Sequence, residues 1–266
     1  VVAVVRACAT HGVALTVTGG RSGVLGASVP LLGGVALDMC GLAGISAVDA
    51  TSGIVSVLPG TFGDVFEDDL RRSHHLTVGH WPQSMALSTV GGWVACRGAG
   101  QYSTRYGKIE DLVVGLDVVL ADGTLIHTGG APRAAHGPDL TQLFVGSEGT
   151  LGVVTRAILR LVPGQQPPAT VVATFPSVAV AADAVIALGR TVRASMVELM
   201  DHGSINAVED HSPMGLNRDA GALLLIQSDA PSAARADEVA AAVAACEGAG
   251  ASEVFATDDP AEGEMF

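Results

Sequence analysis

The chain has 266 residues, of which 48% are hydrophobic and only 15% are charged, enough for one large domain or two smaller ones. Its 27 acidic residues outnumber its 14 Lys and Arg residues, and the formal net charge is −13. This balance argues against binding to nucleic acid, which requires clustered cations. No apolar run approaches the roughly 20 residues that a membrane-spanning helix needs, so we expect no transmembrane span.

The cysteines indicate a reducing compartment. Cys8, Cys40, Cys96 and Cys246 are widely separated and form no Cys-x-x-Cys pair. A zinc site or a redox dithiol is therefore not expected, and a disulfide scaffold is improbable at this length. We predict a cytoplasmic protein with reduced thiols and without a bound metal.

Both ends of the sequence are unusual. The chain has no initiator Met, and Val1–Cys8 is typical of a helix that is already under way and ends near Gly12. The sequence stops at Phe266 without a terminal element. We therefore expect that an amino-terminal part of the first domain, and a carboxyl-terminal part of the second, lie outside this chain.

The first part of the chain alternates short strands, helices and Gly-rich turns. Residues 13–17 are rich in apolar and β-branched side chains and lead to Gly19-Gly20, which predicts a strand followed by a tight loop. Residues 61–72 begin acidic and finish basic, which favours a helix. Asp122-Gly123 predicts a hairpin turn. Further strands are expected at residues 35–39, 53–58, 113–120 and 125–128, and alternation resumes over 151–161.

A Pro-rich stretch at residues 163–168 indicates a domain boundary. We predict a first domain at 1–163, a linker at 164–169 and a second domain at 170–266. The second domain has helices between its strands, which predicts an α+β arrangement with one helical face. Its strands are expected at 170–175, 196–199 and 222–227, and its helices at 178–189 and 232–246. We expect these strands to take partners from sequence outside the chain.

Three Gly-rich segments are the strongest chemical signals. They are Gly19–Gly26, directly after a predicted strand, Gly79–Trp93, and Gly146–Thr155, directly before one. Glycines allow backbone amides to converge on phosphate oxygens without obstruction by Cβ atoms. The first segment matches neither Gly-x-Gly-x-x-Gly nor the P-loop pattern, so by itself it is also compatible with a plain turn.

Taken together, the motifs resemble the FAD-binding domain of the vanillyl-alcohol-oxidase superfamily. This group includes FAD-linked D-lactate and 2-hydroxyacid dehydrogenases and alkyl-dihydroxyacetonephosphate synthase. The resemblance rests on segments 19–27, 82–84, 88–97, 106–113 and 146–152. It implies an α+β protein, in which a PCMH-type FAD-binding fold of two subdomains is followed by part of an α+β cap domain with an antiparallel sheet.

The resemblance also implies that FAD is the cofactor and assigns residues to it. The first loop would lie on the pyrophosphate, and Ser84 to Gly92 would line the pyrophosphate and ribityl region. Residues 96–99 would border the flavin, and residues 148–154 would hold the adenosine side. The full set is Gly19, Gly20, Arg21, Ser22, Gly23, Pro82, Gln83, Ser84, Ser88, Thr89, Gly91, Gly92, Cys96, Arg97, Gly98, Ala99, Glu148, Gly149, Gly152, Val153 and Val154. No histidine occurs in the first loop, where some relatives attach flavin covalently, so we expect non-covalent FAD.

Three residues near the predicted cofactor site need separate treatment, because one departs from the family pattern and two are expected to have structural roles. Arg21 stands where the family usually has a third glycine. Its guanidinium could contact the pyrophosphate, or the side chain could obstruct the close approach of the backbone. Trp93 is expected to serve the core rather than the cofactor, and Asp111 is expected to hold its own loop.

The catalytic residues are not identified by the sequence. Residues 195–201 resemble the segment that opens the cap domain of FAD-linked 2-hydroxyacid dehydrogenases, whereas the ether-lipid synthase has arginine where this chain has Glu198. Arg97, Glu198 and His202 are the candidates within this chain. The base and the groups that hold substrate are expected in sequence beyond Phe266.

The function implied by the resemblance is oxidation of a 2-hydroxy acid, or a similar alcohol, by hydride transfer to N5 of FAD. The partner is then a small-molecule substrate. One alternative is an FAD-dependent transferase of ether-lipid synthesis, like alkyl-dihydroxyacetonephosphate synthase. Another is an incomplete flavin-binding fragment without activity. Substrate identity, electron acceptor and oligomeric state, including a homodimer, are left open.

Overall fold

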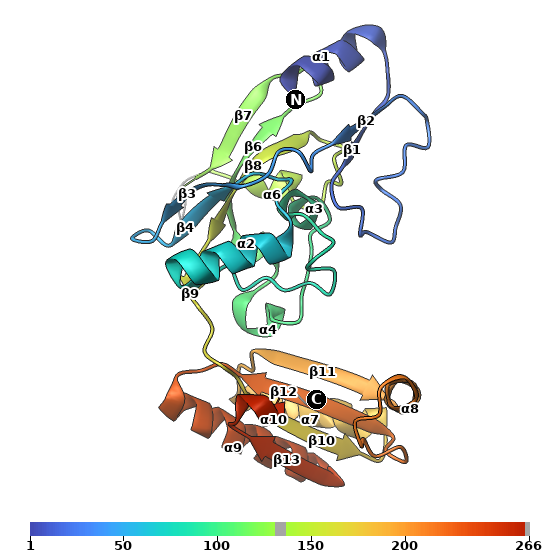
Figure 1. Cartoon of the computed structure of the whole chain (residues 1–266), viewed down its shortest axis with the longest axis vertical. Coiled ribbons are helices and arrows are strands. Elements are labelled where there is room, and N and C mark those ends of the chain that lie inside the picture. The colour runs from blue at the N-terminus through green and yellow to red at the C-terminus, as the bar shows by residue number, and fades with distance from the viewer. Residues whose placement is uncertain (131–136, 264–266) are drawn as a thin grey trace. The chain divides into compact units, whose positions relative to one another are not determined.

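The computed structural model describes residues 1–130 and 137–263, which divide into two compact units (Figure 1). The first unit comprises Val1–Gly100 and Gly107–Gly164, and the second comprises Gln101–Tyr106 and Gln165–Phe266. Residues 101–106 thus make their contacts within the second unit, although the sequence pattern placed them in the first domain. The break near residue 164 falls beside the predicted Pro-rich linker.

The amino-terminal layer of the first unit is a helix packed with a short parallel sheet. α1 (Val2–His11) ends at Gly12, whose φ of 61° suits a glycine at a helix end. β1 (Leu15–Thr18) pairs in parallel with β2 (Val35–Asp38). Val5 and Met39 are buried in the small core of this layer. The packing of this layer fixes the position of the end of β1, and therefore the start of the first Gly-rich loop.

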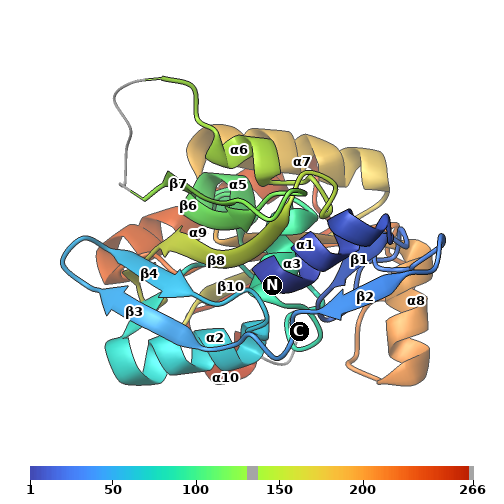
Figure 2. The same cartoon turned by 90° about the horizontal axis from the view of Figure 1, so that it is seen from above.

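The larger part of the first unit is a five-stranded antiparallel sheet, in which β3 and β4 form a hairpin (Figure 2). In spatial order its strands are β3 (Ile45–Asp49), β4 (Ile54–Val57), β8 (Val153–Arg160), β6 (Val113–Val119) and β7 (Leu125–Gly129). β5 (Leu76–Thr77) pairs with β9 (Val162–Pro163) as a separate ribbon. The predicted Asp-Gly hairpin therefore connects β6 to β7.

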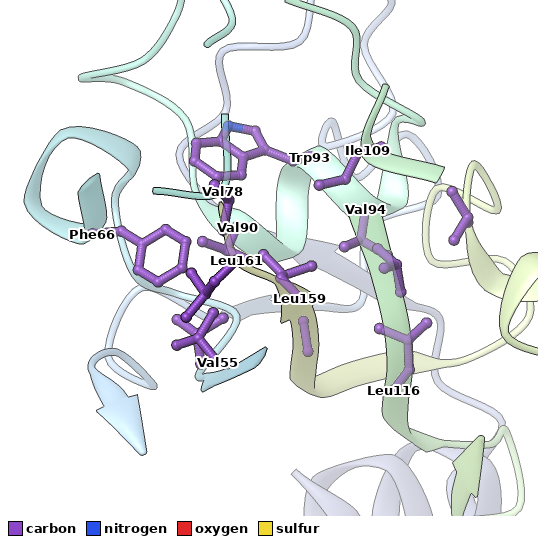
Figure 3. Packing of buried hydrophobic residues seen from close by; sticks show 14 of the residues in the cluster. Val55, Phe66, Val78, Val90, Trp93, Val94, Ile109, Leu116, Leu159 and Leu161 are labelled. Carbon is purple, nitrogen blue, oxygen red and sulfur yellow. The ribbon is translucent and has the colours of Figure 1, made fainter. Parts of the chain in front are cut away.

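Short helices cover the apolar face of this sheet. They are α2 (Gly63–Asp69), which continues as a π-helical turn, η1 (Leu70–His74), and α3 (Val90–Ala95), α5 (Ile109–Leu112) and α6 (Thr141–Phe144). Figure 3 shows the core that they enclose, with Phe66 of α2 and Trp93 of α3 beside strand residues such as Val55 and Leu159. The Phe66 and Trp93 ring centroids lie 6.3 Å apart. This packing fixes α3, whose first turn belongs to the second Gly-rich segment.

A buried carboxylate anchors the start of that segment. Glu67 is 1% exposed and accepts hydrogen bonds from the Thr77 hydroxyl at 2.6 Å and the Val78 amide at 3.0 Å. Arg71 pairs with Glu67 at 3.1 Å and lies over the Trp81 ring, 5.0 Å from its centroid. A buried charge is tolerated when it is paired and hydrogen-bonded in this way. The network holds the chain where it enters residues 79–93.

The second unit contains one antiparallel sheet with helices on both faces. Its strands, in order, are β11 (Met196–Asp201), β12 (Ala222–Ser228), β10 (Ala169–Phe175) and β13 (Glu253–Thr257). α7 (Val178–Thr191) and α9 (Ser232–Ala249) pack on one face, and α8 (His202–His211) and α10 (Pro260–Gly263) on the other. The expectation that these strands await outside partners was wrong for β10, which pairs with β12 and β13, and for β12, which pairs with β10 and β11. β11 is an edge strand with β12 as its partner among the described residues. The sequence pattern had not identified β13.

Residues 101–106 are fastened to the second unit by buried ions. Arg105, on α4 (Ser103–Tyr106), pairs with Asp229 at 3.0 Å and with Glu238, and its Nε donates to the Arg193 carbonyl at 2.8 Å. The Tyr106 hydroxyl donates to the same Asp229 carboxylate. The partners of this network lie just after β12 and in α9. Residues 101–106, which interrupt the first unit in the sequence, are therefore part of the second unit.

Candidate cofactor-binding site

The three Gly-rich segments converge on a single cavity of the first unit. Its volume is about 370 Å³, within the range of small-molecule sites. Most residues that the sequence assigned to the cofactor line it: Gly19, Gly20, Arg21, Ser22, Gly23, Pro82, Ser84, Ser88, Thr89, Gly91, Gly92, Cys96, Gly98, Ala99, Glu148, Gly149, Gly152 and Val154. Segments that are more than 120 residues apart in the chain therefore share one wall.

Three assigned residues lie elsewhere. Gln83 is exposed and is not part of the cavity wall. The Arg97 side chain pairs with Glu110 at 3.1 Å, and Val153 is buried in the core of the amino-terminal layer. The cavity also includes residues that the sequence had not assigned, among them Val17, Thr18, Val24, Leu25, Met39, Pro59 and Ser147. The strand ends and the apolar part of the first loop gave no signal beyond ordinary hydrophobicity.

The first loop presents unpaired backbone amides. Within the described residues, the amides of Gly20, Arg21, Ser22 and Gly23 donate to no protein acceptor. A Cβ on Gly20 would lie 2.0 Å from the Leu87 carbonyl oxygen, so only glycine allows this loop to lie against the second segment. Successive free amides in a turn form a concave anion site, which fits a diphosphate.

The second segment is held by hydrogen bonds between its own residues. The Thr89 hydroxyl caps α3 by accepting from the Gly92 amide at 3.3 Å. Trp93 Nε1 donates to the Ser88 hydroxyl at 2.7 Å, and Ser88 donates to the Ser84 carbonyl at 2.9 Å. Trp93 is buried, as expected for a core residue, and it also lines the cavity. These bonds fix the orientation of the hydroxyl-bearing wall.

The third segment follows an unusual backbone path. Glu148 and Gly149 have φ angles of 50° and 80°, in the left-handed region that favours glycine. The Gly146 and Glu148 amides donate to the Val94 and Ala95 carbonyls at 2.9 and 3.0 Å. The turn is thereby attached to the end of α3, and backbone strain of this kind is concentrated at ligand sites.

Arg21 is the only non-glycine residue with left-handed φ in the described part of the first loop, at 59°. Its guanidinium pairs with Asp38 at 3.2 Å, and both side chains are more than half exposed. The pKa of Asp38 is lowered, chiefly by the hydrogen bond from the Cys40 amide. An exposed pair contributes under about 1 kcal/mol, so the guanidinium is free to exchange Asp38 for a diphosphate.

Replacing Arg21 with glycine is therefore expected to raise the Kd for FAD about tenfold, within the 1–3 kcal/mol range of hydrogen bonds to charged groups. The unfolding free energy without FAD should change by less than about 1 kcal/mol, because the lost pair is exposed and the left-handed strain is relieved. Titration of flavin fluorescence measures the Kd. Asp38→Asn, which removes the competing carboxylate, is the control and should not weaken binding. Equal or tighter binding by Arg21→Gly would exclude the guanidinium as a ligand.

The candidate catalytic residues belong to different units: Arg97 to the first, and Glu198 and His202 to the second. Arg97 has a φ of 53° and is engaged with Glu110. In the second unit, Glu198 stands opposite Leu225 on the sheet face that α8 covers. His202 Nδ1 lies 3.1 Å from the Ala220 carbonyl oxygen. Within residues 1–130 and 137–263 there is no group of His, Cys, Asp and Glu suited to a metal, and no helix long and apolar enough to cross a membrane.

Comparison with known proteins assigns both units. Residues 1–129 match the family model described as FAD binding domain, and residues 165–266 match the model described as FAD linked oxidases, C-terminal domain. The chain therefore contains an FAD binding domain followed by a C-terminal domain of FAD linked oxidases. The predicted resemblance, the α+β fold and FAD as the cofactor are confirmed.

Individual relatives of this chain are named for different activities. The chain is 36% identical to glycolate oxidase subunit GlcD of Bacillus subtilis over 229 residues, covering 84% of this chain and 48% of that protein. It is 34% identical to alkyldihydroxyacetonephosphate synthase of Caenorhabditis elegans over 167 residues, covering 61% and 28%. A solved alkyldihydroxyacetonephosphate synthase structure superposes with a TM-score of 0.84 at 22% identity, covering 100% of this chain and 55% of that one. The chain thus spans about half, or less, of these relatives.

Proposed function

We propose that this chain holds FAD non-covalently in the cavity of its first unit. The observation that carries the proposal is the convergence of three Gly-rich segments on one cavity of about 370 Å³. The free amides of the first loop suit the diphosphate, and the wall at residues 96–99 suits the flavin. A Cβ on Gly20 or Gly91 would collide with the backbone of Leu87 or Pro59, so only glycine allows the chain segments of the wall to approach this closely.

Heat precipitation tests the non-covalent link. Protein purified with FAD, or reconstituted with it, is expected to release yellow flavin into the supernatant when it is denatured, because the first loop has no histidine to attach it. Absorbance of the supernatant and the pellet gives the partition. Flavin retained by the pellet would exclude non-covalent binding, and failure of the native protein to bind any FAD would exclude the site.

For the whole protein, we propose oxidation of a 2-hydroxy acid or a related secondary alcohol. The Bacillus subtilis relative is named as a glycolate oxidase subunit, and glycolate is a 2-hydroxy acid. Bound FAD would supply the hydride acceptor, and the protein would orient it and exclude water around it. Glu198 and His202 belong to the second unit, which matches the carboxyl-terminal oxidase domain, and they are the proposed contributions of this chain to the substrate side.

The transferase of ether-lipid synthesis is the second candidate, because the chain is also 34% identical to the Caenorhabditis synthase. Anaerobic mixing of the whole FAD-loaded protein with 2-hydroxy acids separates the two proposals. Bleaching of the flavin absorbance is expected for the oxidoreductase. Stable absorbance with every acid in the panel would favour the transferase.

A further inference from the structure

The backbone passes between the two units three times, and two of these crossings flank residues 101–106, called the insert below. The chain leaves the first unit after Gly100, returns to it at Gly107, and leaves it again after Gly164. Gly98 lines the cavity, so the first crossing follows directly on the cavity wall. The last crossing follows β9, which is not part of the wall. The insert is therefore the part of the second unit that is joined most directly to the cofactor site.

The two ends of the insert are held in the first unit beside the cavity wall. The Ile109 amide donates to the Gly98 carbonyl at 3.1 Å, which joins the chain entering the insert to the chain leaving it. A Cβ on Gly100 would lie 2.5 Å from the Trp81 carbonyl oxygen and 2.8 Å from the Pro82 nitrogen, so the two backbones are in close contact. Gly98 and Pro82 both line the cavity. A shift of the insert would therefore act on two residues of the wall.

The position of the insert itself is set in the second unit. Its helix, α4, is a single turn, which is not stable in isolation. Arg105 pairs with Asp229 at 3.0 Å and also with Glu238. The Arg193 Nε donates to the Thr104 carbonyl at 3.3 Å. The Arg105 and Asp229 side chains are 16% and 4% exposed, so their attraction is screened little by salt.

We propose that Arg105 is a positioning residue of the cofactor site, through which bound FAD and the ion pairs of the second unit stabilise one another. The inference rests on the proposed FAD site. FAD in contact with Gly98 favours the backbone position from which the insert reaches its carboxylates. By thermodynamic linkage the effect is reciprocal, so the ion pairs favour the wall geometry that binds FAD.

Replacing Arg105 with glutamine should raise the Kd for FAD roughly fivefold, at the lower end of the range for coupled sites. Titration of flavin fluorescence measures the change. Phe175→Leu is the matched control. Phe175 is 1% exposed in the core of the second unit, and it pairs with Ala222 at the opposite end of β12 from Asp229. This variant should lower the unfolding free energy of the second unit and leave the Kd for FAD unchanged.

Hydrogen exchange measures the reciprocal effect. In the parent protein, FAD should slow amide exchange in peptides from β12 and α9, although neither element is part of the cavity wall. In Arg105→Gln, saturating FAD should still slow exchange in residues 19–26 and 146–152 of the first unit. It should no longer slow exchange in β12 and α9. A purely structural role for Arg105 would not make protection of the second unit depend on FAD.

The outcomes separate the inference from the function on which it rests. A parent protein that binds no FAD would overturn the FAD site itself and the inference with it. A parent that binds FAD, with an Arg105→Gln variant of equal affinity, would overturn only the coupling. Exchange in β12 and α9 that is unaffected by FAD in the parent would do the same. Equal rises of Kd in Arg105→Gln and Phe175→Leu would assign Arg105 to the general stability of the second unit, and would also overturn the inference.

Discussion

Replacing Gly149 with valine is expected to weaken FAD binding at least 100-fold, or about 3 kcal/mol of binding free energy. Gly149 lines the cavity with a φ of 80°, and a Cβ there would lie 3.6 Å from Val17, another residue of the cavity wall. A branched side chain would thus occupy space that the ligand needs. Equilibrium titration with FAD, followed by flavin fluorescence, measures the change.

The same substitution also strains the backbone, so it needs a control of equal strain. Gly12 has a φ of 61°, has no atom within 4 Å of an added Cβ, and is not part of the cavity wall. Gly12→Val should therefore lower the unfolding free energy by about 1–2 kcal/mol and leave FAD affinity unchanged. A folded Gly149→Val protein with the affinity of Gly12→Val would show that residues 146–152 form only a turn.

Replacing Arg105 with glutamine is expected to destabilise the second unit by about 3 kcal/mol. The guanidinium is 16% exposed and pairs with Asp229, which is 4% exposed, and with Glu238. Removing one partner of a buried ion pair leaves the remaining charges uncompensated, which commonly costs 3–5 kcal/mol, and glutamine recovers part of this through its amide. Hydrogen exchange of peptides from β12 and α9 should become faster in the variant.

A surface ion pair supplies the comparison for Arg105. Arg72 and Asp68 lie 2.9 Å apart on consecutive helical turns, with side chains 79% and 62% exposed. Arg72→Gln should therefore cost less than about 0.5 kcal/mol. If Arg105→Gln costs no more than Arg72→Gln in urea unfolding, residues 101–106 do not fasten the second unit.

Local patterns predicted the elements whose burial follows from their own residues. The strand at 113–119 and its Asp-Gly hairpin were placed correctly because apolar alternation and turn chemistry act over a few residues. α3 was not predicted, because it contains Gly91 and Gly92, and each glycine costs about 1 kcal/mol in a helix. The Thr89 cap and the burial of Trp93 and Val94 outweigh that cost, and the burial depends on distant parts of the chain.

The outline of the site could be predicted from the sequence, but its fine geometry could not. Gly-rich segments indicated close backbone approach, and the family resemblance assigned most of the cavity wall in advance. The partners of Arg97 and Arg21, which are Glu110 and Asp38, depend on side-chain directions that no local pattern specifies. The burial of His80 likewise gave no signal, since it lies between Gly79 and Pro82 in a segment without helical or strand periodicity.

Segments that cross between units were the least predictable. The three polar partners of Arg105 lie 88 to 133 residues further along the chain, so nothing near residues 101–106 indicates that they belong to the second unit. The edge strand β13 was missed for a related reason. Its alternation is weak, and Phe255 on it remains 44% exposed.

Protection of Cys96 by FAD is the most direct test of the central claim that FAD binds in this cavity. Cys96 is exposed and lines the cavity, whereas Cys40 is partly exposed and lies outside the wall. Partial desolvation of the thiol and the Glu148 carboxylate raise the pKa of Cys96, so alkylation should be carried out at mildly alkaline pH, where enough thiolate forms. Mass spectrometry of the peptides should show Cys96 modified in the FAD-free protein and protected in proportion to bound FAD, with Cys40 labelled equally in both. Unchanged labelling of Cys96 in protein saturated with FAD would place the cofactor elsewhere and contradict the account.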